Sequence, residues 1–317
     1  LRDYYVCCLS RQVSISIRKE VLIGRAKFGV SDDGKELLQV AMAKSFKKGD
    51  FRADYYRGHT LLLALDLFKI EDIFAQLYAD GKNDPFSGGR QMNGHHATPL
   101  VDKDGNWLPQ KELFNLSSDI STTGGSVARG FGLAYASKTY RESELLKSTD
   151  FSNQGNEVCF CNIGDGSTSE GVFWEAMNAA GVTQIPLVMS VFDDGYAISV
   201  PKKLQTVKES ISESLQGMQK EKGTNGIEIV KVNGWDYLDL CTQYEKAVSN
   251  TRKTHTPSLI HVDELTQPQG HSTSGSHERY KSRQRLDWEA EYDCNLQFKK
   301  WILGEGVAED SELKKLE

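Results

Sequence analysis

The sequence predicts an α/β protein with a mostly parallel sheet flanked by helices, on the basis of two observations. Two apolar runs with the length of buried strands are joined by a helical pattern through short connections. A second unit of the same kind follows later in the chain. Strand–helix–strand units of this kind make their two strands parallel, with a right-handed crossover. The units are strand 157–163, helix 169–182 and strand 186–192, then strand 227–232, helix 236–253 and strand 258–264.

The segments around these units predict further helices and one long loop. Amphipathic patterns predict helices over 34–46 and 70–80, and a run of small residues predicts a closely packed helix over 122–139. Residues 83–120 are rich in Gly, Pro, Asn and Ser, which predicts a long structured loop of the kind that usually serves a function. A charged, partly amphipathic helix is expected over 283–303.

These patterns divide the chain into three parts. We expect an N-terminal segment over 1–33, a ligand-binding α/β domain over 34–282 and a C-terminal helical extension over 283–317. The last residues, Ser311–Glu317, begin a helix and show no stop signal, so we expect the polypeptide to continue beyond them.

Composition argues against several classes of protein. The chain has 38 basic and 44 acidic residues among 317, a formal net charge of −6, so we expect no nucleic-acid partner. The longest apolar run, 61–65, is far too short to cross a bilayer, so we expect no membrane span. Cys159 and Cys161 lack a second Cys/His pair for a zinc site. Free thiols in the cytoplasm, or the mitochondrial matrix in a eukaryote, are therefore expected.

Acidic residues follow both strands of the first unit. The turn Gly164-Asp165-Gly166-Ser167 comes after one strand, and Asp193-Asp194-Gly195-Tyr196 comes after the other. Ligands bind outside the carboxyl ends of parallel strands, where these two segments meet. Carboxylates suit Mg²⁺, while glycines and a following helix N-terminus let backbone amides approach an anion. The sequence therefore predicts a site for a Mg²⁺-bridged diphosphate.

This region has two other interpretations. Each half alone is more often only a turn or a loop, but both halves together, with 26 residues between Gly166 and Asp193, favour a ligand site. A nicotinamide dehydrogenase would need a third glycine three residues after the second. Ser169 stands there, and the next glycine is Gly171, so this alternative is weaker.

The stretch from Gly164 to Ser199 resembles the thiamine diphosphate motif, which runs from Gly-Asp-Gly to Asn-Asn. Its surroundings resemble the alpha subunit of the decarboxylating component of 2-oxo acid dehydrogenases, in particular the branched-chain type. The resemblance covers roughly 34–317 and implies a thiamine diphosphate-binding fold. The further stretches that carry it are Tyr55-Tyr56-Arg57, 87–92 (SGGRQM), Ser117-Ser118, 167–171 (STSEG) and 270–274 (GHSTS).

This resemblance implies roles for individual residues. Asp165 and Asp194 would bind Mg²⁺, together with the backbone carbonyl of Tyr196. His271 and His95 would be the catalytic histidines, although a lone histidine such as His95 is more often structural. The other cofactor contacts would come from Tyr56, Arg57, Gly164, Gly166, Ser167 and His271 at the diphosphate and from Ser118 and Ile120 at the middle of the cofactor.

Three departures from the family pattern matter. Asp194 replaces the second Asn of the motif, which adds a negative charge beside the diphosphate. Phe192 stands where branched-chain relatives carry an arginine, so one cation is missing. Residues 119–126 differ from the Pro- and Gln-rich version in the family, which argues against a monovalent-cation site there. We expect Mg²⁺ binding to persist and cofactor affinity to be weaker.

The implied activity is decarboxylation of a 2-oxo acid and reductive acylation of a lipoyl group within a multienzyme complex. In this family the glutamate that activates the cofactor comes from a beta-type subunit. We therefore expect the chain to need a beta-type subunit or a fused beta half, and the unfinished helix at 311–317 favours fusion. A lipoyl domain would be the next partner. A non-catalytic homologue is the alternative, whereas a self-sufficient transketolase would not fit into 317 residues.

One more loop has two interpretations. Residues 266–280 (TQPQGHSTSGSHERY) are dense in Gly, Ser, Thr and His, which is typical of an ordinary flexible loop. By resemblance the loop would instead belong to the active site and become ordered when the cofactor binds. Ser272 and Ser274 stand where some relatives are phosphorylated, and a phosphate there would add negative charge beside His271.

Overall fold

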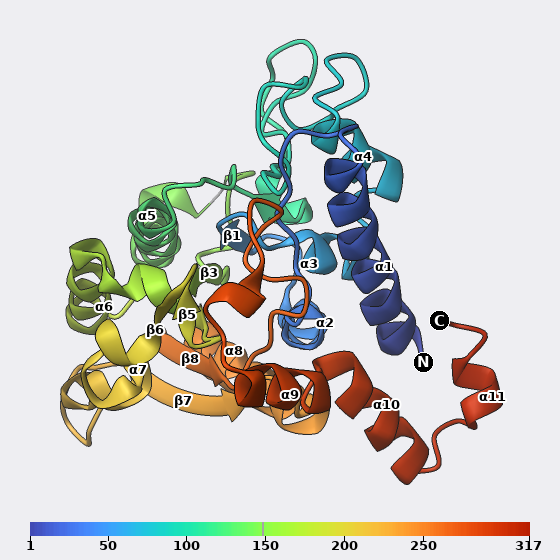
Figure 1. Cartoon of the computed structure of the whole chain (residues 1–317). Coiled ribbons are helices and arrows are strands. Elements are labelled where there is room, and N and C mark those ends of the chain that lie inside the picture. Colours follow the sequence, from blue (N-terminus) through green and yellow to red (C-terminus); the bar gives the residue numbers. More distant parts are fainter. Residues whose placement is uncertain (148) are drawn as a thin grey trace.

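A parallel six-stranded sheet forms the centre of the computed structural model, which describes residues 1–147 and 149–317 (Figure 1). The strand order is β2-β1-β3-β4-β8-β7, and every neighbouring pair is parallel. The predicted fold class is confirmed. The strands are β1 Phe51–Ala53, β2 Asn115–Leu116, β3 Cys159–Gly164, β4 Leu187–Phe192, β7 Glu228–Asn233 and β8 Ser258–Asp263, with a separate hairpin of β5 Tyr196–Ala197 and β6 Val200–Pro201.

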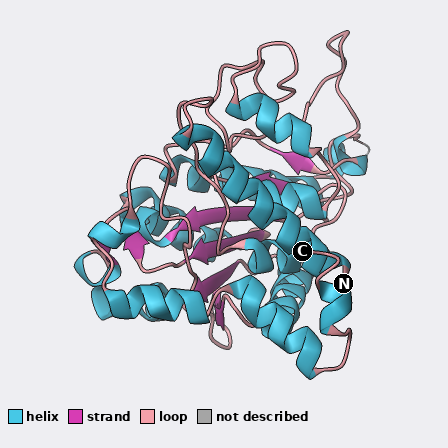
Figure 2. Cartoon of the chain, turned by 45° about the vertical axis from the view of Figure 1, so that its right-hand side comes forward, coloured by secondary structure: helices cyan, strands magenta, loops and turns pink. Residues whose placement is uncertain are grey.

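Helices surround this sheet (Figure 2). The α-helices are α1 Arg2–Leu22, α2 Glu36–Ser45, α3 His59–Ala64, α4 Ile70–Leu77, α5 Gly124–Glu142, α6 Gly171–Thr183, α7 Ile211–Ser214, α8 Tyr237–Thr254, α9 Arg283–Glu291, α10 Cys294–Gly304 and α11 Asp310–Leu313. Single 3₁₀ turns lie at Gln110–Glu112, Glu144–Leu146, Asp165–Ser169, Lys202–Leu204, Val207–Glu209, Gln216–Met218 and His277–Arg279. In the described ranges, no helix is both long enough and apolar enough to cross a membrane.

Both faces of the sheet are buried. Successive strand residues point to opposite sides and pack there against different helices. Phe160 of β3 packs into a cluster with α2 and α8, while its neighbours Cys159 and Cys161 pack into a second cluster with α5 and α6. Strands covered on both sides are apolar along their whole length. This explains why the runs at β3 and β4 were recognisable in the sequence as buried strands.

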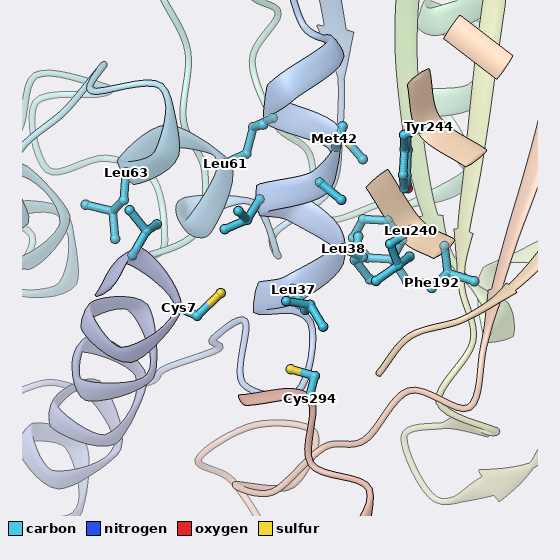
Figure 3. Close-up of a cluster of buried hydrophobic side chains, with 14 of the residues drawn as sticks. Cys7, Leu37, Leu38, Met42, Leu61, Leu63, Phe192, Leu240, Tyr244 and Cys294 are labelled. Atoms are coloured by element: carbon cyan, nitrogen blue, oxygen red, sulfur yellow. The ribbon is translucent and has the colours of Figure 1, made fainter. Parts of the chain in front are cut away.

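Helix α2 lies at the centre of the first cluster (Figure 3). Its residues Leu37, Leu38 and Met42 are fully buried between Leu61 of α3 on one side and Tyr244 of α8 on the other. The amino end of this helix is therefore held rigidly against the sheet. That end reaches the carboxyl edge of the strands, where the predicted ligand site lies.

Among the elements that differ from the sequence-based expectations are α1, β1 and the helix expected over 283–303. Helix α1 was not predicted, and neither was β1, which pairs with β3 inside the sheet although it has only three residues. Such a short strand shows no alternation that a pattern could reveal. The prediction of one helix over 283–303 is wrong. The chain turns at Tyr292, and the Asp293 carboxylate then caps α10 by accepting hydrogen bonds from the amides of Asn295 (3.0 Å) and Leu296 (3.2 Å).

The two ends of the chain pack on the same core. Tyr4, Cys7 and Ile17 of α1 belong to the α2 cluster, as does Cys294 of α10 (Figure 3). The divisions at 33/34 and 282/283 stay predictions. All six cysteines are free in the part of the chain that the structure describes.

We expect the change Ile17→Ala to lower the free energy of unfolding by about 2–5 kcal/mol, because it leaves a cavity beneath α1. Ile17 is 1% exposed, whereas Ile15 on the same helix is 39% exposed and provides the control. Urea denaturation of both variants measures the difference. Equal losses for Ile15→Ala and Ile17→Ala would show that α1 does not belong to the core.

Candidate functional site

A cavity of about 270 Å³ opens at the carboxyl edge of the sheet, where β3 and β4 end. The turn after β3 and the segment after β4 both contribute to its wall, as the parallel arrangement requires. Its lining residues are Lys35, Tyr55, Tyr56, Arg57, Ser121, Thr123, Gly164, Asp165, Gly166, Ser167, Glu170, Phe192, Asp194, Tyr196, Ala197, Ile198 and His271.

Asp165 carries a buried carboxylate oxygen without a partner. The residue is 4% exposed, and its Oδ2 accepts no hydrogen bond. Burial, together with the negative charges of Asp194 and Asp193, raises the pKa of Asp165 well above its usual value. A divalent cation would supply both the missing partner and the opposing charge, and oxygen is the ligand that Mg²⁺ prefers. The residue therefore fits the metal that the motif implies.

Asp194 faces the same cavity from the end of β4 but already has a counterion. Its Oδ2 accepts a hydrogen bond of 2.8 Å from Nζ of Lys35. Its Oδ1 accepts one of 3.2 Å from the backbone amide of Tyr196. Burial would raise the pKa of Asp194, but Lys35, with Lys281 and Arg57, lowers it to about 2. Asp194 is therefore ionised and available as an oxygen ligand.

Close packing explains one glycine of the turn after β3. A Cβ atom added at Gly166 would lie 2.4 Å from Cβ of Ala197 in β5, so a side chain there would push the hairpin away. Ser167 forms a hydrogen bond through its hydroxyl with the hydroxyl of Thr123. Glu170 accepts a 3.1 Å hydrogen bond from the amide of Gly124 at the start of α5. The turn is thus fixed to both neighbouring segments.

Arg57, Tyr56 and His271 also line the cavity. Arg57 is 3% exposed, and its guanidinium donates hydrogen bonds to the backbone carbonyls of Ser31 and His271, the latter at 2.6 Å. The rings of Tyr56 and His271 meet edge to face at 6.2 Å. Burial and then the charge of Arg57, 3.2 Å from Nδ1 of His271, lower the pKa of His271 to about 4. His271 is therefore neutral at neutral pH.

The segment 31–36 (SDDGKE) joins these groups beneath the cavity. Gly34 has φ +83°, and a Cβ there would lie 2.1 Å from the carbonyl oxygen of Thr266, so glycine is required. Lys35 donates to that same carbonyl at 2.9 Å, and Asp33 accepts a 2.7 Å hydrogen bond from the amide of Gln269. This segment therefore anchors the first part of the loop 266–280.

Helix α1 and the residues after it hold the rest of that loop. Arg18 donates to the carbonyl of Gln269 at 2.9 Å, and the amide of Thr273 donates to the carbonyl of Gly29 at 3.0 Å. Ser272 and Ser274 flank Thr273, ahead of the 3₁₀ turn at His277–Arg279, and their hydroxyl oxygens are 2.8 Å apart.

Three predicted site residues do not line the cavity. Ser118 and Ile120 lie in the same loop as Ser121, which does line it. His95 is 3% exposed and reaches the cavity indirectly, because its Nε2 lies 2.7 Å from the hydroxyl of Ser121. The roles of Ser118, Ile120 and His95 stay predictions.

Sequence reasoning missed Lys35 and the partners of Asp193. Nothing in the pattern around Lys35 distinguishes it from a surface lysine at a helix start. Asp193 does not line the cavity; its carboxylate accepts a hydrogen bond from Lys202 (2.7 Å) and shares one with His261 (2.8 Å). Ligand atoms of Asp193, His261 and Asp263 lie within 4.8 Å of one another, but Lys202 already bridges the two carboxylates.

Phe192, which replaces an arginine of the family pattern, is 1% exposed at the end of β4. Its ring packs edge to face against Tyr55 at 6.0 Å. An apolar contact therefore occupies this wall of the cavity, and the missing cation is not restored at the same position.

We expect Arg57→Met to raise the pKa of His271 from about 4 toward its ordinary value without reaching it, since burial persists. An NMR titration of the His271 ring protons measures this, with Arg252→Met at the other end of the sheet as the control. An unchanged pKa would mean that Arg57 has no electrostatic effect on the ring.

The lowered pKa of His271 predicts that the free energy of unfolding depends on pH. The unfolded histidine takes up a proton below about pH 6.5, whereas the folded one does so near pH 4. The unfolded state therefore binds more protons between these values, and His271 lowers the free energy of unfolding as the pH falls through this window. Denaturation of His271→Asn across that range should show a flatter profile than the wild-type chain.

Comparison with known proteins gives the family. A family model described as the dehydrogenase E1 component matches residues 9–317. The chain is 27% identical to 2-oxoisovalerate dehydrogenase subunit alpha of Bacillus subtilis over 289 residues, which cover 90% of this chain and 76% of the relative. It is 28% identical to pyruvate dehydrogenase E1 component subunit alpha of Acholeplasma laidlawii over 321 residues, covering 100% of this chain and 79% of the relative.

The mitochondrial 2-oxoisovalerate dehydrogenase subunit alpha of Mus musculus is 24% identical over 293 residues, which cover 92% of this chain and 58% of that relative. These relatives carry the name of alpha subunits, and the family model covers nearly the whole chain. The chain therefore belongs to the dehydrogenase E1 component family, as an alpha-type 2-oxo acid dehydrogenase chain.

Proposed function

We propose that this chain binds thiamine diphosphate through Mg²⁺ and provides the alpha-type half of a component that decarboxylates a 2-oxo acid and acylates a lipoyl group. The observation that carries the proposal is the pair Asp165 and Asp194. The two carboxylates end neighbouring parallel strands, line one cavity, and leave one buried oxygen of Asp165 without a partner. Family membership supports the cofactor.

Different residues of the cavity wall would have different roles. Asp165, Asp194 and the carbonyl of Tyr196 would hold the metal, while Arg57 would bind phosphate oxygens with its planar fork of donors. His271, which is neutral and accepts from Arg57 at Nδ1, carries its proton on Nε2 and can donate it to a group bound beside it. Thiamine diphosphate, when bound, supplies the carbon chemistry of decarboxylation. The contribution of the protein is binding, orientation and charge.

The chain would depend on a beta-type partner. Among the described residues that line the cavity, the one glutamate is Glu170, and it is engaged with the amide of Gly124. No glutamate of the described cavity wall is therefore free for the activating role that the beta-type subunit has in the family. A beta-type subunit or a fused beta half would provide it, and a lipoyl domain would accept the product. A cytoplasmic or matrix location fits the free thiols.

The substrate would be a 2-oxo acid. Relatives named for 2-oxoisovalerate and for pyruvate are 27% and 28% identical to this chain, so identity does not choose between a branched and a short side chain. Decarboxylation assays of the complete assembly with a panel of 2-oxo acids decide this question.

Calorimetric titration of the assembly with thiamine diphosphate should show binding that requires Mg²⁺, and Asp165→Ala should abolish it. Asp263→Asn is the matched control, because Asp263 also ends a strand at this edge but is held by Lys202 and Lys231. Retained affinity in Asp165→Ala would place the metal elsewhere. Absence of Mg²⁺-dependent binding in the wild type would favour a non-catalytic homologue.

The isolated chain should decarboxylate 2-oxo acids at less than about 1% of the rate of the assembly, since losing a catalytic acid–base group costs about 10²–10⁴-fold. Adding the beta-type partner should restore the rate, as followed by CO₂ release. A rate for the isolated chain that equals that of the assembly would disprove the dependence on a partner.

A further inference from the structure

Lys35 is a buried lysine in the wall of the candidate site. Its side chain is 1% exposed, although lysines normally keep their ammonium group in water. It directly precedes α2, and the left-handed backbone of Gly34 before it turns the chain toward the cavity. Burying an ammonium is costly unless its protons are bound and its charge is balanced. The partners of Lys35 therefore show what it does.

All three protons of the Lys35 ammonium have acceptors. They point to Oδ2 of Asp194 at 2.8 Å, the carbonyl of Thr266 at 2.9 Å and Oε1 of Gln267 at 2.5 Å. Because an ammonium group has three donors, none is left for a phosphate oxygen. Lys35 therefore acts on a bound anion through its charge and through Asp194, not as a direct phosphate ligand.

The carboxylate of Asp194 needs a positively charged partner, whereas a neutral amide at this position would not. The motif that this region resembles has Asn at this position, and here a carboxylate faces Asp165, which has an unpartnered oxygen of its own. Two carboxylates and a diphosphate in one cavity would repel one another. Lys35 is in hydrogen-bond contact with Asp194, while Arg285 reaches only the backbone carbonyl of Asp194, at 2.8 Å.

We propose that Lys35 and Asp194 form a charge-balanced pair that takes the place of the neutral amide of the motif. Lys35 is a positioning residue that neutralises Asp194 and fixes its carboxylate for the metal-bound diphosphate. This inference rests on the proposed function. The pair accounts for the added negative charge at Asp194, but it leaves the cation that Phe192 displaces without a substitute.

A purely structural role is the competing explanation. Lys35 also holds Thr266 and Gln267 at the start of α2. On this explanation, its loss would loosen the loop 266–280 and lower the affinity for any ligand of the site. The two explanations differ in one respect. A clamp on the loop works whichever residue stands at 194, whereas the charge pair matters only while Asp194 is charged. A double-mutant cycle separates them.

The cycle uses the wild type, Lys35→Gln, Asp194→Asn and the double variant, each in the assembly with its beta-type partner. Calorimetric titration with thiamine diphosphate and Mg²⁺ gives the affinities. Lys35→Gln should weaken binding by about tenfold or more when Asp194 is present, because it leaves a buried charge unpaired. In the Asp194→Asn background, the same change should cost less than about threefold, since no charge remains to be balanced.

Thermal unfolding of the four chains without cofactor provides a second readout. Lys35→Gln should lower the melting temperature clearly when Asp194 is present and much less in the Asp194→Asn background. Arg252→Gln is the matched control, because Arg252 forms a partly buried ion pair with Asp50 at the opposite edge of the sheet. It should lower the melting temperature and leave the affinity within about twofold of the wild type, since it lies far from the site.

Equal losses of affinity in both backgrounds would overturn the charge pair in favour of the loop clamp. An unchanged affinity of Lys35→Gln for thiamine diphosphate would overturn the charge pair as well. A wild-type assembly without Mg²⁺-dependent binding would overturn the proposed function, and the inference with it. The first outcome leaves the cofactor site intact and the second does not, so the two failures are distinguishable.

Discussion

The site depends on one constraint, which is that the charges of the segment 31–36 are buried and must each be paired. Asp32, Asp33, Lys35 and Glu36 are at most 1% exposed, and unpaired buried charges are strongly unfavourable. Each one therefore reaches a different element: Asp32 binds His59, Asp33 binds the 266–269 loop, Lys35 binds Asp194 and Glu36 binds Arg11 of α1. Six residues thus fix the walls of the cavity relative to one another.

This arrangement positions the binding groups of the site before any ligand arrives. The carboxyl group of Asp165 has an unpartnered oxygen, while Arg57, in the same cavity wall, is held by the carbonyls of Ser31 and His271. A preorganised site of this kind needs little rearrangement when a cation and an anion bind together, which favours affinity and orientation. When the segment 31–36 folds and its charges find their partners, the cofactor site is therefore formed as well.

Patterns in the sequence identified most of the long or periodic elements, but not α1, although it has 21 residues. The strands β3, β4, β7 and β8 are six-residue apolar or half-buried runs, and the crossover helices between them have clear patterns. β1 has three residues, and its place beside β3 follows from long-range pairing. The break between α9 and α10 depends on Asp293, which caps the start of α10 and requires a particular backbone turn. Local patterns carry neither kind of information.

The sequence by itself determined the fold class, the strand ends that carry Asp165 and Asp194, and the family likeness. These follow from local composition and from the rule that parallel strands end at one edge. Only the tertiary structure decided that Asp194 is paired with Lys35, that Asp193 is paired with Lys202 and His261, and that Ser121 rather than Ser118 lines the cavity. Side-chain partners from distant segments, such as Lys35 and Asp194, which are 159 residues apart, are chosen by packing and charge balance in three dimensions, which no spacing along the chain records.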